Sequence, residues 1–117
     1  MGRIKEDNLE NIFERSPDVE VVFEFNDVKT KPIYDGYRPA HLVKDDYLTT
    51  GIHKYNEVEC VYPNTRVKGT ITFITPEAYP NCLWIGKEII IQEGSIVVGK
   101  ATVVKVLNKT LEVSYER

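Results

Sequence analysis

The side chains best suited to chemistry in this 117-residue chain are two histidines and two cysteines, His41, His53, Cys60 and Cys82. They are its only soft metal ligands, and none of them form a C-x-x-C or H-x₃₋₅-H pair, so we predict no zinc site. A cysteine nucleophile needs a histidine, a third orienting group and a cleft, and the sequence offers no such arrangement. We therefore expect no catalytic residues, no cofactor and no enzyme activity.

Phosphate chemistry is equally unsupported. The chain contains no G-x-x-x-x-G-K-[ST] motif, so it lacks the glycine-rich loop that cradles nucleotide phosphates. The adjacent carboxylates of Asp45 and Asp46 are interpreted as a solvated loop, because neighbouring side chains in a strand point to opposite faces. These observations predict no nucleotide site and exclude a GTPase.

Length and charge narrow the class of protein. The chain is of single-domain size, and its net charge of −3 disfavours a bulk electrostatic hold on nucleic acid. No apolar run approaches the roughly 20 residues of a membrane span, and the N-terminus lacks the pattern of a secretory signal. We expect a cytoplasmic protein with both cysteines reduced and with no membrane partner.

The elements that would position any site begin with one short helix. Leu9, Ile12 and Phe13 follow helical spacing, and Ser16-Pro17 ends the pattern. We assign residues 1–17 to a short N-terminal helix and extension. A helix of two to three turns is marginal alone, so its apolar stripe must pack on another part of the protein.

From residue 18 onward the hydrophobic pattern has the period of two that is typical of strands. The segment VEVVFEFN places Val19, Val21, Phe23 and Phe25 on one face, and RVKGTITFI repeats the alternation. Further β-rich segments bounded by turn residues are KEIIIQEG, SIVVGKATVVKVL and TLEVSYE. The absence of helical patterns between them predicts an all-β fold, a single antiparallel barrel of six or seven strands over residues 18–117.

Several motifs occur in an order that resembles the third, C-terminal β-barrel of elongation factor Tu, shared among translational GTPases. The stretch KPIYDGYRP, residues 31–39, resembles the family's T-P-aromatic-aromatic-x-G-Y-R-P, and LTTG, residues 48–51, resembles its V-T-G. The segments that complete the resemblance, over about 90 residues, are VYPNTRVKGTITFITPEAY and IIIQEGSIVVGKATVVKVL. The resemblance implies a stand-alone barrel without the GTPase domain.

In that family the barrel contacts the T-stem of aminoacyl-tRNA, packs on the GTPase domain and binds the exchange factor. The resemblance therefore implies contacts at Glu93 and Gly94, which match E-G, and at Thr50 and Gly51, which match T-G. Other matched positions differ: Lys29-Thr30 replaces an Arg-His, Ala40 a Gln, Gln92 an Arg and Ser95 a Gly. Half of the implied RNA contacts are thus altered.

Three hypotheses follow. The first is a non-catalytic module that binds a protein partner through the loops at one end of the barrel. If the resemblance extends to function, that partner belongs to the translation apparatus. The residues predicted for that surface are Tyr34, Tyr37, Arg38, Thr50, Gly51, Glu93 and Gly94, with Trp84 nearby or on its own patch. The second is a tRNA- or RNA-binding module that uses Lys29, Lys31 and Arg38 beside the two tyrosines. The third is a structural or immunity-type protein that reuses the barrel.

Each of these residues also has a purely structural interpretation. Arg38 can tie a loop through backbone carbonyls or by stacking on an aromatic ring. Tyr34 and Tyr37 can close a barrel end with their hydroxyls at the surface. Trp84 can pack locally within the turn-rich segment that carries it, rather than anchor an interface.

Overall fold

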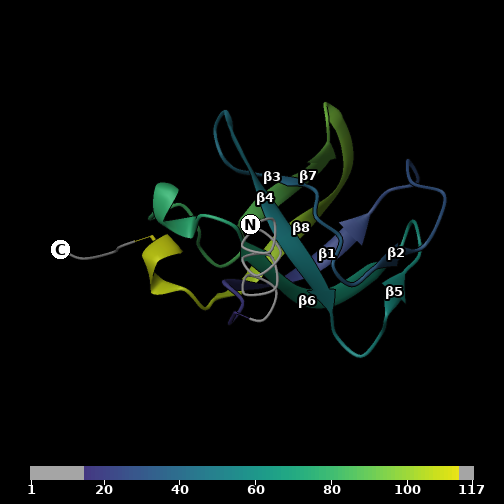
Figure 1. Ribbon diagram of the computed structural model, residues 1–117, viewed down its shortest axis with the longest axis horizontal. Helices are drawn as coiled ribbons and strands as arrows, with labels where there is room; N and C mark the ends of the chain where they lie inside the picture. Colours follow the sequence, from purple (N-terminus) through teal and green to yellow (C-terminus); the bar gives the residue numbers. More distant parts are fainter. Residues whose placement is uncertain (1–14, 114–117) are drawn as a thin grey trace, which may run out of the picture.

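The computed structural model describes residues 15–113 and shows a closed antiparallel barrel (Figure 1). The single barrel predicted from the sequence is confirmed. The helix predicted ahead of Pro17 falls almost entirely in residues 1–14, outside the described part of the chain. Among residues 15–113, no helix is both long and apolar enough to cross a bilayer.

Six strands close the barrel in the order β1-β6-β4-β3-β7-β8, with β8 returning to pair with β1. Their bounds are β1 Val19–Phe25, β3 Ala40–Lys44, β4 Tyr47–Tyr55, β6 Arg66–Phe73, β7 Glu88–Glu93 and β8 Ile96–Val106. Two-residue strands β2, Ile33–Tyr34, and β5, Cys60–Val61, pair separately. All of these pairings are antiparallel, and β3–β4 and β7–β8 are hairpins.

The interior is filled by the alternation read from the sequence. Val19, Val21, Phe23 and Phe25 are all buried, because successive side chains of β1 point alternately into and out of the barrel. The inward side chains of β7 and β8 are aliphatic and pack against these aromatic rings, with Ile91 and Val98 among them. The core is thus continuous around the barrel axis.

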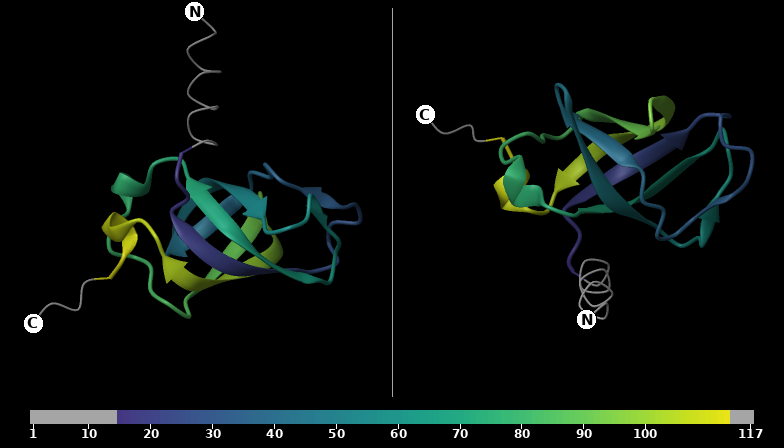
Figure 2. Two further views of the ribbon diagram at one scale, coloured as in Figure 1. Left: turned by 90° about the horizontal axis from the view of Figure 1, so that it is seen from below. Right: turned by 45° about the horizontal axis from the view of Figure 1, so that its top comes forward.

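Different structures cover the two ends of the barrel (Figure 2). The β2–β5 pair lies at one end, and two 3₁₀ turns, η1 Pro76–Ala78 and η2 Lys109–Leu111, lie at the other. The prediction of a strand over TLEVSYE is wrong for its described part. Asn108 accepts a hydrogen bond from the Thr110 N–H and starts η2, and only one bridge, between Leu83 and Glu112, follows.

The turns between the strands have the backbone conformation and exposure that their residue types favour. Gly36 and Gly94 both have positive φ, at 91° and 58°, a region that glycine enters without steric cost. Asp45 and Asp46 are exposed in the β3–β4 hairpin, as predicted. At the chain's entry into the barrel, the buried carboxylate of Asp18 accepts hydrogen bonds from the Phe73 N–H at 2.7 Å and the Asn108 amide at 2.9 Å.

Candidate functional site

Three predicted site residues meet at the barrel end that carries β2 and β5. The Glu93 carboxylate, at the end of β7, accepts a hydrogen bond from Lys29 Nζ at 2.7 Å and a short one from the Tyr37 hydroxyl. The Lys29 ammonium also lies 5.3 Å from the centre of the Tyr37 ring. We call Lys29, Tyr37 and Glu93 the mouth network.

The mouth network has a clear electrostatic consequence. The hydrogen bonds from Lys29 and Tyr37 lower the pKa of Glu93 below its usual value. Burial, followed by the hydrogen bond to Glu93, raises the pKa of Tyr37 far above its usual value, so Tyr37 stays a neutral donor. The Lys29 charge is therefore already paired within the molecule.

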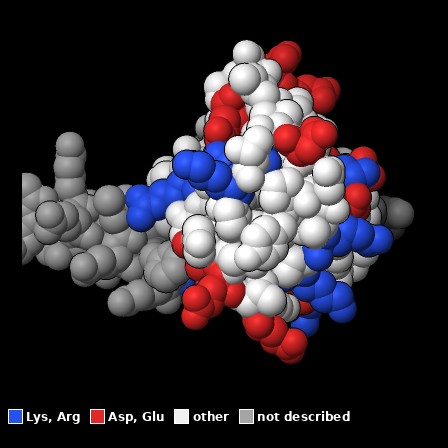
Figure 3. Space-filling view, turned by 90° about the vertical axis from the view of Figure 1, so that its right-hand side faces the viewer, with Lys and Arg blue, Asp and Glu red and all other residues white. Residues whose placement is uncertain are grey.

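Beside the mouth network, four large apolar side chains are exposed. Tyr34 on β2 is 60% exposed and Tyr62, just after β5, is 59% exposed. Val28, between β1 and β2, and Val58, between β4 and β5, are also exposed. We call Val28, Tyr34, Val58 and Tyr62 the end patch. Figure 3 shows this end of the barrel: the middle of the face is uncharged, and Lys, Arg, Asp and Glu gather around it.

The remaining predicted residues of this surface divide into exposed and buried positions. Arg38 and Lys31 are exposed, and Gly94 lies in the exposed β7–β8 turn, where its carbonyl accepts from the Gln92 amide. Thr50 is half-buried on the outer wall, paired with Ala40. Gly51, by contrast, is buried in the wall of the barrel and faces the core, so it has no surface to offer a partner.

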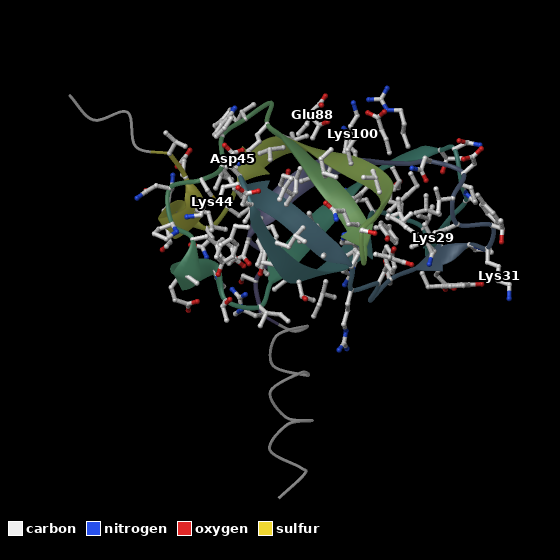
Figure 4. All side chains as sticks on the ribbon, turned by 90° about the horizontal axis from the view of Figure 1, so that it is seen from above. Lys29, Lys31, Lys44, Asp45, Glu88 and Lys100 are labelled. Carbon is white, nitrogen blue, oxygen red and sulfur yellow. The ribbon has the colours of Figure 1, made fainter. Side chains whose placement is uncertain are left out.

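Trp84 is not part of this end. It is 43% exposed and lines a hollow of about 450 Å³ together with Lys44 and Asp45. Figure 4 shows Lys44 and Asp45 at one end of the molecule and Lys29 and Lys31 at the other. Of the two placements considered from the sequence, the structure has Trp84 on a patch of its own.

The Trp84 ring is also used within the protein. Lys87 Nζ lies 4.6 Å from the ring centre and donates hydrogen bonds to the carbonyls of Cys82, at 2.7 Å, and Val43. Burial lowers the pKa of Lys87 below its usual value. One face of the indole is therefore covered by the lysine, and neighbouring Ile85 is the more exposed side chain.

The two histidines and Cys82 are buried inside the protein, and Cys60 is half-buried. His41 and His53 have no exposed surface, and their Nε2 atoms lie 2.7 Å apart inside the barrel. Both cysteines are free, and burial raises the pKa of the Cys82 thiol above its usual value. Within residues 15–113, no three His, Cys, Asp or Glu side chains gather in a way that could hold a metal ion.

The end patch and the histidine pair were not identified from the sequence. Val28, Val58 and Tyr62 lie in turns or just beyond two-residue strands, where no periodic pattern indicates exposure. The histidines did carry a signal, because His41 is in phase with buried Val43, and His53 with buried Tyr55. The chain matches no protein-family model.

Proposed function

We propose that this chain is a non-catalytic binding module that holds a protein partner at the barrel end formed by β2 and β5. The observation that carries the proposal is the end patch, whose four large apolar side chains are exposed. The face at this end of the barrel is uncharged in the middle and charged around it (Figure 3). Apolar surface rimmed by charge is typical of protein interaction sites. Tyrosine is also enriched among the residues that dominate binding energy.

A protein partner fits this end better than RNA. A phosphate backbone is bound by cations that are free to replace its counterions. Lys29 is paired with Glu93 at 2.7 Å, so one of the three cations predicted for RNA is neutralised within the protein. Lys31 and Arg38 are exposed, but they belong to a chain of net charge −3.

The likeness to the third domain of elongation factor Tu remains part of the proposal. It is supported by the order of the motifs and by the closed antiparallel barrel over the same residues. On this view the partner belongs to the translation apparatus and the protein works in the cytoplasm. The two free cysteines fit a reducing compartment.

The test is site-specific photo-crosslinking of the full chain in its own cells. A photoreactive phenylalanine analogue replaces Tyr34 or Tyr62 in the end patch. Ile74, exposed after the opposite end of β6, is the matched control, and Trp84 tests the second patch. We expect Tyr34 and Tyr62 to crosslink to the same protein and Ile74 to give no such product.

The variant Tyr34→Ser with Tyr62→Ser should weaken binding of that protein by more than tenfold, since truncating a central aromatic anchor costs about 2 kcal/mol or more. Crosslinking from Trp84 alone would overturn the choice of surface. Capture of tRNA would instead establish the RNA-binding alternative, provided that its binding weakens steeply with salt and in Lys29→Ala with Arg38→Ala.

A further inference from the structure

The interior of the barrel contains a hydrogen-bonded chain of polar side chains. His41 on β3 and His53 on β4 are fully buried, with 2.7 Å between their Nε2 atoms. On the outer sides of the pair, His41 Nδ1 lies 3.3 Å from the Thr49 carbonyl, and His53 Nδ1 lies 3.1 Å from the Tyr55 hydroxyl. These are the only two histidines in the sequence.

The partners at each end determine where the protons are. A carbonyl only accepts, so His41 Nδ1 carries a proton and donates it to Thr49. In neutral His41 the Nε2 atom is then an acceptor, and His53 Nε2 must donate to it. His53 Nδ1 is left as an acceptor for the Tyr55 hydroxyl. All hydrogen bonds therefore run in one direction, from Tyr55 to Thr49.

Extra protons do not fit this arrangement. Protonation of His41 places two N–H groups against each other across 2.7 Å, unless His53 moves its own proton to Nδ1 and Tyr55 turns to accept it. A second proton makes both rings donors at every nitrogen, and no rotation then restores the bond between the rings. The pair holds at most one extra proton while the rings stay in contact.

Among residues 15–113, no carboxylate forms a hydrogen bond with either imidazole. Phe23 and Phe25 from β1 and Phe73 from β6 pack against the imidazoles, and the inward side chains of β7 and β8 are aliphatic. The titratable groups facing the pair are the phenols of Tyr55, on β4, and Tyr37, on the β2–β3 connection. Two carboxylates contact these tyrosines: Asp35 accepts from the Tyr55 backbone N–H and Glu93 from the Tyr37 hydroxyl.

The pair is also joined to the barrel end described above. The backbone N–H of His53 donates to the Tyr37 carbonyl at 2.9 Å, and the backbone N–H of Gly36 donates to the His53 carbonyl at 2.8 Å. The Tyr37 ring packs edge-on against the His53 ring, with their centres 5.4 Å apart. A displacement of His53 therefore disturbs residues 34–37, which carry Tyr34 of the end patch and Tyr37 of the mouth network.

We propose that the His41–His53 pair is an acid-sensitive lock, in which proton uptake breaks the bond between the rings and releases residues 34–37, so that the barrel end gives up its partner. The release of a partner rests on the proposed function, whereas the lock itself does not. Burial lowers the pKa of His41 to about 4, and burial and the His41 charge lower that of His53 well below its usual value.

The direction of the effect follows from these pKa values. Both imidazoles take up protons near pH 6.5 in the unfolded chain but only well below that pH in the barrel. The lock is therefore fully stable above about pH 6.5 and weakens as the pH falls toward 4. The depressed pKa of His41 alone should raise the unfolding equilibrium constant roughly sevenfold between pH 6 and pH 5, and the depressed pKa of His53 adds to the rise in the same direction.

The experiment uses the full chain. Imidazole ¹⁵N chemical shifts at pH 7.5 should report protons on His41 Nδ1 and His53 Nε2 and should stay constant down to about pH 5. Urea unfolding at pH 7, 6 and 5 should show a rise in the unfolding equilibrium constant of at least about sevenfold between pH 6 and pH 5, and amide exchange of Gly36 should accelerate with it. The control is His41→Gln with His53→Gln, which removes every imidazole, keeps hydrogen-bonding side chains and should lose most of this pH dependence.

Histidine shifts that titrate near pH 6.5 in the folded protein would overturn the lock, and this measurement needs no variant to fold. Unchanged pH dependence in the double variant would overturn it as well. For release of the partner, crosslinking from Tyr34 is compared at pH 7.5 and at pH 4, where His41 is about half protonated. Equal crosslinking at both pH values refutes the release step, whereas a lack of crosslinking at pH 7.5 refutes only the proposed function.

Discussion

Gly51→Ala tests whether this glycine is needed for packing or for a partner. A Cβ atom at position 51 would lie 2.6 Å from Ile71 Cγ2, 3.0 Å from His41 Cε1 and 3.1 Å from Phe73 Cδ1. All three neighbours are fully buried and have little room to move. The substitution therefore forces one extra methyl group into a filled core.

Overpacking of this kind costs about 1–3 kcal/mol, and the loss of glycine's freedom in the unfolded chain returns about 0.4–1 kcal/mol. We expect a net loss of about 1–2 kcal/mol in the free energy of unfolding, which for a domain of this size lowers Tm by about 5–10 °C. The neighbouring Thr50→Ala is the matched control. Thr50 is half-buried on the outer wall, so its Tm should change by only a degree or two.

Tm is measured by circular dichroism or calorimetry at neutral pH, and the crosslinking yield from Tyr34 is measured below both transitions. We expect Gly51→Ala to be less stable and to crosslink normally once folded. A variant that keeps its Tm but loses its partner would refute the packing argument and restore Gly51 as a contact residue. A Tm loss shared equally by Thr50→Ala would show that the strand, rather than the core contact, is responsible.

Two further substitutions test buried polar groups by urea denaturation. Asp18→Ala leaves the Phe73 N–H without its acceptor at 2.7 Å, and an unsatisfied buried donor costs about 1–3 kcal/mol; a loss below about 0.5 kcal/mol would contradict this role. Lys87→Met removes the donor to two carbonyls, so we expect a loss of about 1–2 kcal/mol. The same variant should change the fluorescence of Trp84, the only tryptophan, and an unchanged spectrum would refute the contact with its ring.

The barrel could be predicted because the alternation of buried and exposed side chains is a local property of each strand. Val19, Val21, Phe23 and Phe25 are two residues apart, and that spacing alone assigns them to one face. The strand predicted over residues 110–116 is wrong in its described part, residues 110–113, for an equally local reason. The Asn108 side chain binds the Thr110 N–H and turns the backbone into η2 before a ladder can form.

The candidate site was harder to predict because it depends on neighbours far apart in the sequence. Lys29 and Glu93 are 64 positions apart, and only the closure of the barrel brings their charges to 2.7 Å. The sequence assigned Trp84 to a turn-rich segment, which is correct. Its distance from Tyr37, however, depends on which end of the barrel that segment covers. No sequence pattern predicts the Lys29–Glu93 pairing or the end of the barrel at which Trp84 lies.

The histidine pair shows how strand pairing gives a polar residue its environment. His41 and His53 are inward positions on adjacent strands, and the β3–β4 pairing places His41 opposite Thr49, four residues before His53. Gly51, between these positions, has no side chain, and the side chains of Ile71, His41 and Phe73 crowd the space where its Cβ would stand. The absence of a side chain at Gly51 therefore leaves the room that the buried His41 imidazole needs. From the buried pair, the His53 ring contacts the ring of Tyr37, and the Tyr37 hydroxyl donates to Glu93 at the surface.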